Sequence, residues 1–384
     1  PITGQYYWVV PGDSLWRIGQ RFGINYLTLA QVNNINVNAP LITGTRLYIP
    51  PRPKTSAEVN AYIEPFGATV SEPLLNDAAK AAPYLTYIAP FSYRAGSNGT
   101  LSPLPLNGIP EIAANNNASL MMVITNLTAA GFSGQIARDI LTSVAVQEQL
   151  ITNILAEAQR VGIFSDIHFD FEFIPIDLKE EYTAFLRRAA ARLRPNGYLI
   201  SAALAPKTSA TQPGQWYEAH DYGAIAREVD FVVIMTYEWG YSGGPPMPVS
   251  PIVPVERVLQ YALTEMPASK ILMGQNLYGY DWTLPYIAGG PFARAISPQT
   301  AIEIAKNNGV AIQYDYTAQA PFFNYTINGI RHIVWFEDAR SIQAKFDLLK
   351  RLNLRGISYW KLGLSFPQNW LLIGDNFNVV KRQS

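Results

Sequence analysis

Residues 164–172, Phe-Ser-Asp-Ile-His-Phe-Asp-Phe-Glu, form a strand pattern that ends in two carboxylic acids, Asp170 and Glu172. Side chains alternate across a strand at about 3.3 Å per residue, so both carboxyl groups point the same way, with backbones roughly 6 to 7 Å apart. Two carboxyl groups held close together repel each other when both are ionised, so one of them stays protonated near neutral pH. Such a pair can divide acid and base work. The simpler alternative is an ion-paired strand end.

The two faces of this stretch differ in polarity. The polar face holds His168, Asp170 and Glu172, and the other face holds Ile167, Phe169, Phe171 and Phe173. This pattern is typical of a barrel strand whose polar face looks inward and whose apolar face is covered by helices.

Strand-like runs alternate with helical runs from residue 57 onward, which predicts an α/β fold with a (β/α)8 TIM barrel over residues 57–384. The gap between the seventh and eighth strands is too long for one helix. It predicts an α+β insertion at about residues 290–340, with a helix over 296–308 followed by three strands. The eight expected barrel strands are 59–64, 84–91, 119–125, 163–172, 198–205, 230–238, 270–278 and 355–361.

Composition limits the classes of function. The 384 residues are 48% hydrophobic, enough for a barrel core plus a small appended module. The 29 basic and 29 acidic side chains balance without basic runs, so we expect no nucleic-acid partner. Cysteine is absent and the three histidines lack metal-ligand spacing, so we expect no metal and no cofactor. No apolar run reaches the roughly 20 residues that span a bilayer, so we expect no membrane partner. We also expect the protein to be a monomer.

A proline-rich stretch predicts a linker over residues 51–56, after a small folded unit over residues 5–50. The unit has a β-α-α-β pattern, with a first helix capped by Asp13 or Ser14 and ending at Gly23. The second helix is expected over residues 26–33 and the closing strand over residues 45–49. The first residue is Pro1 rather than Met, which leaves open whether a leader was removed.

This small unit resembles a LysM domain in its segments Val9–Trp16, Asn33-Asn34 and Thr43–Pro50. LysM domains bind chains that contain N-acetylglucosamine. The resemblance implies that the glycan contacts here are Gly12, Asp13 and Ser14 in the first loop and Leu41 and Ile42 in the last. The alternative is a module that serves only as an assembly contact.

The larger part resembles glycoside hydrolase family 18, the chitinase-like enzymes. Residues 165–172 are similar to the family's D-x-x-D-x-D-x-E strand, although Ser165 and His168 replace two of its aspartates. Met235–Glu238 is similar to M-x-Y-D, and Gly356–Trp360 to the last strand, whose tryptophan forms the floor of the sugar site. Residues 277–282 resemble the seventh-strand segment, whereas Met121–Asn126 replaces the S-x-G-G of the third strand.

The resemblance implies a role for each matched residue. Glu172 is expected to protonate the glycosidic oxygen and then deprotonate water, while the 2-acetamido oxygen of the sugar attacks. Asp170 and the Tyr237 hydroxyl would hold the acetamido group. His168 is expected to be a buried partner that orients Asp170, with a direct catalytic role as the alternative. The expected substrate-binding residues are Trp360, Glu238, His168, Asn126, Tyr278 and Trp239.

Residues 235–247 and 359–370 are also similar to spore cortex-lytic N-acetylglucosaminidases of Bacillus-type bacteria. This similarity implies retaining hydrolysis of β-1,4 bonds after N-acetylglucosamine in peptidoglycan, at the bacterial cell wall or in the spore coat or cortex. Two alternatives stay open, a chitinase that acts on chitin or its oligosaccharides, and a non-catalytic, lectin-like member that binds glycan.

Overall fold

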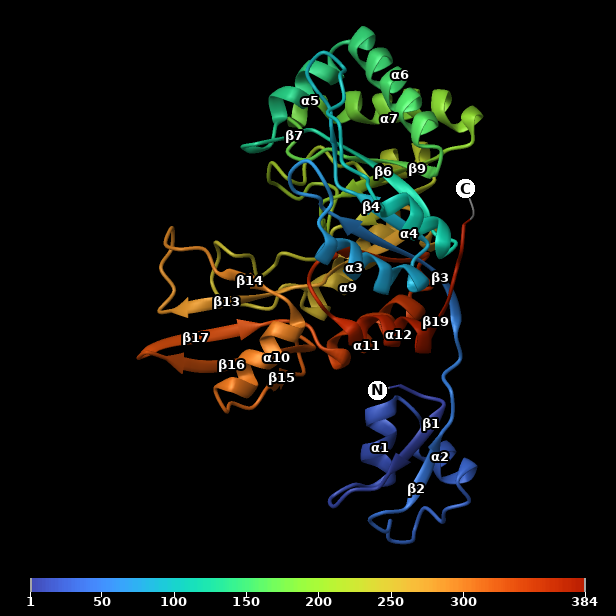
Figure 1. Cartoon of the computed structure of the whole chain (residues 1–384), viewed down its shortest axis with the longest axis vertical. Helices are drawn as coiled ribbons and strands as arrows, with labels where there is room; N and C mark the ends of the chain where they lie inside the picture. Colours follow the sequence, from blue (N-terminus) through green and yellow to red (C-terminus); the bar gives the residue numbers. More distant parts are fainter. Residues whose placement is uncertain (1, 383–384) are drawn as a thin grey trace. The chain divides into compact units, whose positions relative to one another are not determined.

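The computed structural model describes residues 2–382 and divides into two compact units (Figure 1). The first unit consists of the residues up to Ser56 together with Pro367–Asn378, and the second of Ala57–Phe366 together with the residues from Val379 onward. Helix α12 (Pro367–Asn376) therefore groups with the N-terminal residues, whereas the sequence pattern assigned it to the barrel. The limits 5–50, 51–56 and 57–384 remain a prediction.

The second unit is a closed barrel of eight parallel strands, as expected. The closing strand β18 pairs with β12 on one side and with β3 on the other, so the barrel has no free edge. In chain order the strands are β3 (Thr55–Ile63), β4 (Tyr87–Pro90), β6 (Ser119–Thr125), β9 (Phe164–Asp170), β10 (Leu199–Leu204), β11 (Phe231–Ile234), β12 (Ile271–Asn276) and β18 (Gly356–Trp360).

Several strands end earlier than the sequence pattern predicts. β9 ends at Asp170 and β11 at Ile234, so Glu172 and Tyr237 lie in the loops that follow these strands. The expectation that Phe173 belongs to the apolar face is wrong, because the strand alternation has stopped. Phe173 has a φ of 53° and is 43% exposed. The loop conformation thus begins at the carboxyl end of the strand, directly after Asp170.

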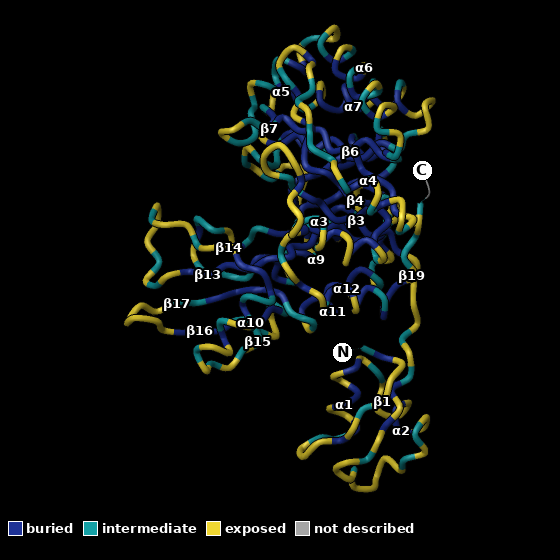
Figure 2. The backbone as a smooth tube through the Cα atoms, in the orientation of Figure 1, coloured by how far each residue is buried: buried dark blue, intermediate teal, exposed yellow. Residues whose placement is uncertain are grey.

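Helices cover the outer, apolar face of the barrel. Phe169 packs edge-on against Phe185, and Phe171 stacks on Tyr182, so helix α7 (Lys179–Leu193) covers this side of β9. Burial follows the same arrangement, with buried strands and more exposed helices (Figure 2). The other barrel helices are α3 (Glu72–Ala81), α4 (Ile109–Asn115), α5 (Gly134–Leu141), α6 (Val144–Val161), α8 (Tyr222–Glu228), α9 (Ile252–Glu265) and α11 (Ala339–Arg351). The short strands are β5 (Tyr93–Arg94), β7 (Leu127–Thr128), β8 (Gly131–Phe132) and β19 (Phe377–Val379).

The insertion between β12 and β18 is a five-stranded antiparallel sheet with one helix, as predicted in kind. It begins at Gly279, ahead of the predicted start near residue 290. A Cβ at Gly279 would lie 2.3 Å from the Trp335 carbonyl oxygen, which is too close for any side chain. Glycine at this position therefore allows the first strand of the insertion to pair closely with the strand that ends at Trp335. The elements are β13 (Gly279–Leu284), β14 (Arg294–Ile296), α10 (Pro298–Asn307), β15 (Gln313–Asp315), β16 (Ala320–Ile327) and β17 (Ile330–Trp335).

The first unit contains the expected β-α-α-β pattern. Ser14 rather than Asp13 caps the first helix, since its hydroxyl accepts from the Arg17 amide, and Gly23 ends that helix with a φ of 64°. The hydroxyl and amide of Thr3 both donate to Asp375 of α12, at 2.6 and 3.0 Å. The elements are β1 (Gln5–Trp8), α1 (Leu15–Phe22), α2 (Tyr26–Val32) and β2 (Arg46–Ile49).

Among the described residues, no helix has both the length and the apolar character needed to cross a membrane.

Candidate active site

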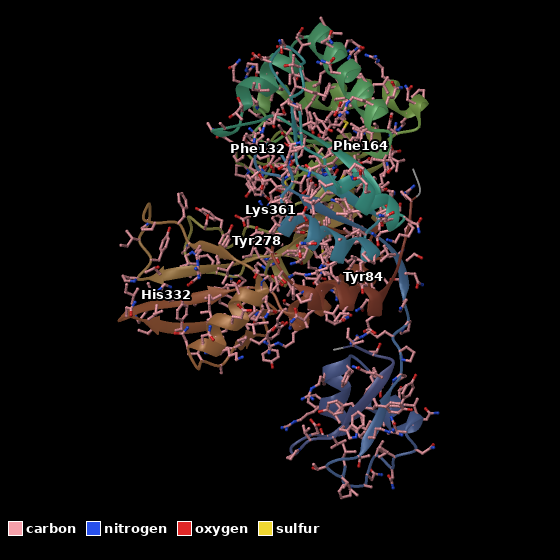
Figure 3. All side chains as sticks on the ribbon, viewed as in Figure 1. Tyr84, Phe132, Phe164, Tyr278, His332 and Lys361 are labelled. Carbon is pink, nitrogen blue, oxygen red and sulfur yellow. The ribbon has the colours of Figure 1, made fainter. Side chains whose placement is uncertain are left out.

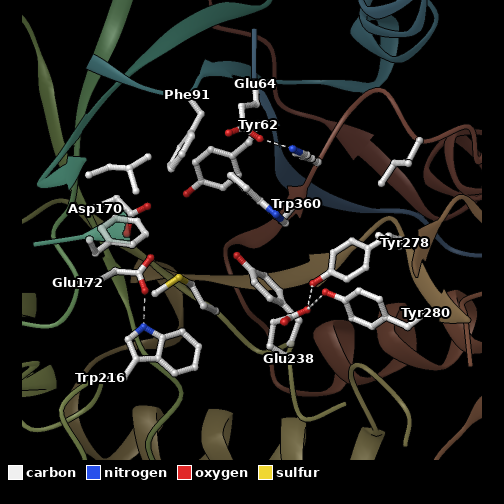
Figure 4. A pocket seen from close by; sticks show the side chains of 17 residues that line it. Tyr62, Glu64, Phe91, Asp170, Glu172, Trp216, Glu238, Tyr278, Tyr280 and Trp360 are labelled. Carbon is white, nitrogen blue, oxygen red and sulfur yellow. Dashed lines mark hydrogen bonds and ion pairs between the residues drawn. The ribbon is translucent and has the colours of Figure 1, made fainter. Parts of the chain in front are cut away.

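A pocket of about 490 Å³ lies where the barrel strands end, which is where active sites of such barrels are built. Its lining comes from many separate segments, for example Phe132 from β8, Tyr278 after β12 and Lys361 after β18 (Figure 3). Of the predicted residues, the pocket brings together Asp170, Glu172, Tyr237, Glu238, Tyr278 and Trp360 (Figure 4).

Asp170 and Glu172 meet side chain to side chain in this pocket, and both are buried. Burial raises the pKa of Asp170 to about 7, while the hydrogen bond from Glu172 opposes that rise. Burial also raises the pKa of Glu172 well above its ordinary value, and the charge of Asp170 raises it further. Glu172 therefore keeps its proton near neutral pH, in the range where Asp170 gains or loses its own.

One oxygen of Asp170, Oδ1, has no hydrogen-bond partner among the described residues although it is buried. A buried carboxylate oxygen without a donor is costly unless a ligand supplies one. Asp170 can therefore accept an N–H group from a bound substrate while it contacts Glu172.

Asn126 holds the backbone of Glu172. Its Oδ1 accepts from the Glu172 amide at 3.0 Å, and its Nδ2 donates to the Glu172 carbonyl at 2.8 Å and to the Ser133 carbonyl at 3.0 Å. The side chain is fully buried and does not line the pocket. The expectation of a substrate contact fails here because the polar atoms of Asn126 are used by the backbone.

His168 lies beneath the pocket and differs from expectation in its partners. Its Nε2 lies 2.9 Å from the Tyr62 hydroxyl and its Nδ1 2.7 Å from Ser201 Oγ, which donates to Asp166 at 2.5 Å. Burial lowers the pKa of His168 to about 3, so the ring is neutral. Because Ser201 gives its proton to Asp166, Nδ1–H donates to Ser201, and Nε2 accepts from Tyr62. His168 thus positions Tyr62, a pocket residue, through a hydrogen bond that the sequence pattern assigned to Asp170.

Trp216 is a pocket residue that the sequence analysis missed. It lies between β10 and α8, and its indole N–H donates to the Glu172 carboxyl, which lowers the pKa of that group against the effect of burial. The segment is held from beneath by the buried His220, whose Nε2 lies 2.9 Å from the Phe171 carbonyl oxygen. Lys207 supports His220 in turn, since its Nζ donates to the His220 carbonyl at 3.0 Å. No motif marks Trp216, and only its place in a loop after a barrel strand could have indicated it.

Aromatic side chains form the rest of the pocket. Trp360 ends β18 and packs edge-on against Phe91, with ring centroids 4.7 Å apart. Glu238, which has a φ of 68°, accepts from the hydroxyls of Tyr278 and Tyr280, and burial raises its pKa. Trp239 lies outside this pocket and lines a neighbouring hollow.

The predicted glycan-contact residues of the first unit fall into two groups. The carboxylate of Asp13 accepts from the Tyr7 hydroxyl at 2.5 Å and from the Val10 amide at 3.0 Å, so it shapes its own loop. Gly12 has a φ of 86° in the same loop, and Ser14 caps α1. In the other loop Leu41 is half-buried, whereas Ile42 is 73% exposed and free to contact a ligand.

Within residues 2–382, no group of three or more His, Cys, Asp or Glu side chains is placed so that it could hold a metal ion.

Comparison with known proteins identifies both parts. Residues 70–364 match glycosyl hydrolases family 18, and residues 7–50 match the LysM domain. The cortical fragment-lytic enzyme of Bacillus subtilis (strain 168) is 61% identical over 334 residues, which are 87% of this chain and 77% of that protein. The crystal structure of the Bacillus megaterium QM B1551 spore cortex-lytic enzyme SleL matches with a TM-score of 0.88 and 52% identity, covering 100% of this chain and 88% of that one.

A more distant match shows the fold alone. The chitinase from Chromobacterium violaceum ATCC 12472 is 23% identical with a TM-score of 0.75, over 83% of this chain and 98% of that chain. The family match covers most of this chain. The chain therefore belongs to glycosyl hydrolase family 18, a family of glycosidases, and carries a LysM domain at its N-terminal end.

Proposed function

We propose that this glycosidase hydrolyses β-1,4 bonds after N-acetylglucosamine in peptidoglycan, and that spore cortex is its natural substrate. The observation that carries the proposal is the buried pair of Asp170 and Glu172, in which Glu172 keeps a proton near neutral pH, in a pocket lined by Tyr237 and Trp360. The identity to a cortical fragment-lytic enzyme favours peptidoglycan over chitin as the polymer. We place the enzyme in the cell wall or spore cortex, acting as a monomer.

The proposed reaction begins with the sugar whose glycosidic bond is cleaved. Glu172 gives its proton to the glycosidic oxygen as the bond from that oxygen to the anomeric carbon breaks. The 2-acetamido oxygen of the same sugar bonds to the anomeric carbon, so that an oxazolinium ring forms and no enzyme nucleophile is needed. Glu172 then takes a proton from water, which attacks the anomeric carbon and opens the ring. The configuration at that carbon is retained.

Two neighbouring side chains stabilise the ring. Asp170 Oδ1, which lacks a partner among the described residues, accepts the acetamido N–H, and its negative charge offsets the positive oxazolinium. Burial raises the pKa of Tyr237, so its hydroxyl keeps its proton and can donate to the acetamido oxygen. The Trp360 ring lies in the pocket as a floor for the apolar face of the sugar.

Digestion of three polymers tests this proposal. Purified spore cortex, vegetative peptidoglycan and chitin are incubated with the enzyme, and the products are reduced and analysed by mass spectrometry. We expect products from cortex that end in reduced N-acetylglucosamine, and less product from chitin. Products that end in reduced muramic acid would contradict the assigned bond, and faster turnover of chitin would contradict the assigned polymer.

A further inference from the structure

The loop that carries Trp216 is fixed to the end of β9 at two points. One is the indole N–H of Trp216, which donates to Oε2 of Glu172. The other is His220, whose Nε2 lies 2.9 Å from the carbonyl oxygen of Phe171. The His220 Nδ1 accepts from the Ala205 amide at 2.9 Å, so the proton of the neutral ring is on Nε2 and is donated to Phe171. The loop is therefore bonded to the backbone of the residue before Glu172 as well as to the Glu172 side chain.

A tight turn sets the direction in which the indole points. The amides of Tyr217 and Glu218 both donate to the Gly214 carbonyl, at 2.9 and 3.1 Å, so Trp216 lies inside the turn. Gly214 has a φ of 130°, a conformation that favours glycine, and a Cβ there would lie 2.8 Å from the Tyr217 ring. The local backbone therefore presents Trp216 to Glu172 as a fixed donor.

The bond from Trp216 also decides which oxygen of Glu172 carries the proton. An indole N–H can only donate, so Oε2 is an acceptor. The carbonyl oxygen of a neutral carboxyl group is its stronger acceptor, so Oε2 is the carbonyl oxygen and Oε1 is the hydroxyl. Asp170 and Trp216 lie on different sides of the Glu172 carboxyl (Figure 4). The hydroxyl on Oε1 is therefore the group that donates to Asp170 in the free enzyme.

We propose that Trp216 is a positioning residue for the acid. Its N–H keeps the proton of Glu172 on Oε1 and stabilises the carboxylate that forms when this proton passes to the glycosidic oxygen. A hydrogen bond to a carboxylate is roughly twice as strong as one to a neutral oxygen, so the contact strengthens as the glycosidic bond breaks. The same contact makes Glu172 a weaker base when water opens the oxazolinium ring. The inference rests on the proposed function, which assigns both proton transfers to Glu172.

Aryl glycosides of a peptidoglycan disaccharide that ends in N-acetylglucosamine test this role. The 2,4-dinitrophenolate group leaves without a proton, whereas 4-methylphenol needs one from the acid. Replacing Trp216 with 3-benzothienylalanine keeps the shape of the side chain and puts sulfur in place of the N–H. We expect this protein to lose about tenfold in kcat/KM on the 4-methylphenyl glycoside and less than about twofold on the dinitrophenyl glycoside. Trp216→Phe should also lose more on the 4-methylphenyl glycoside.

The same replacement at Trp335 is the matched control. The indole N–H of Trp335 is buried without a hydrogen-bond partner among the described residues, and the side chain does not line the pocket. The Trp335 protein should therefore keep the wild-type rate on both glycosides. An equal loss on both glycosides in the Trp216 protein, or no loss on either, would overturn the proposal.

A titration that needs no turnover keeps the proposal separate from the proposed function. The ¹³C-labelled carboxyl group of Glu172 is followed in Asp170→Asn, with tryptophan or 3-benzothienylalanine at residue 216. We expect the midpoint of Glu172 to lie about one pH unit higher without the N–H, because the hydrogen bond from Trp216 lowers the pKa of Glu172. The other titratable side chains of the pocket are the same in both proteins, namely Tyr62, Glu64, Tyr237, Glu238, Tyr278, Tyr280 and Lys361. If the wild type cleaves neither glycoside, the proposed function fails, whereas equal midpoints would overturn the role of Trp216 alone.

Discussion

The barrel pocket and the LysM domain differ in how far their candidate glycan contacts are exposed. In the pocket Asp170, Glu172 and Tyr237 are at most 8% exposed, whereas Trp8, Trp16 and Ile42 of the small unit are more than half exposed. Residues 1–56 carry five of the 29 basic side chains and one of the 29 acidic ones, so the rest of the chain has an excess of acid. Burial keeps a proton on Glu172, and exposure leaves apolar and cationic groups free for a polymer surface. Chemistry and attachment should therefore respond to different substitutions.

The largest effect is expected from Glu172→Gln. The amide keeps the shape of the side chain but has no proton to give, so hydrolysis of soluble fragments should fall at least about 100-fold while binding persists. Initial rates and calorimetry on the same preparation measure the two quantities. Glu303→Gln, the same change on the exposed face of α10, should behave as the wild type. Residual activity above about a tenth in Glu172→Gln would reject its role as the acid.

A smaller effect, confined to attachment, is expected from Ile42→Ala in the LysM domain. Losing about 1 kcal/mol of apolar contact should weaken binding to insoluble wall about fivefold, with turnover of soluble fragments unchanged. A point variant is preferable to truncation, because removal of the first residues would take Thr3 from the buried Asp375. Sedimentation with wall fragments measures the effect, and Ile327→Ala on the insertion is the control. If Ile42→Ala lowered turnover of soluble fragments as much as binding to insoluble wall, the barrel pocket and the LysM domain would not have separate roles in chemistry and attachment.

The smallest effect is expected from His168→Asn. Since the His168 ring is neutral above about pH 3, a neutral amide should leave the acid limb of the pH-rate profile in place. Loss of one neutral hydrogen bond to Tyr62 should reduce turnover at most about threefold. A full pH-rate profile of the variant measures both quantities. An acid limb displaced by about a unit or more would mean that His168 carries a charge that acts on Asp170.

Sequence alone predicted the elements whose patterns are local. The eight barrel strands, the kind of insertion and the β-α-α-β unit all follow from periodicity, caps and turn residues. The carboxyl pair was predicted from the strand pattern of residues 164–172, because Asp170 and Glu172 are two residues apart. Strand ends were placed too late, since the change from strand to loop after Asp170 leaves no mark in the residue types.

The residues that sequence could not place are those brought in by tertiary contacts. Trp216 reaches Glu172 from a loop supported by His220 and Lys207, and nothing in the loop pattern indicates that contact. Asn126 has the residue type of a ligand contact but turns toward the backbone of Glu172. In both cases the sequence separation is 44 residues or more, and only the closed barrel brings the groups together.

The central claim is that burial and the charge of Asp170 keep Glu172 protonated near neutral pH. A ¹³C NMR titration of labelled carboxyl groups in the wild type and in Asp170→Asn measures it directly. We expect Glu172 to stay protonated through neutral pH in the wild type. It should lose its proton at lower pH in Asp170→Asn, because that variant lacks the negative charge that raises the pKa of Glu172. Deprotonation of wild-type Glu172 near its ordinary pKa of 4.5, or the same midpoint in both proteins, would contradict the account.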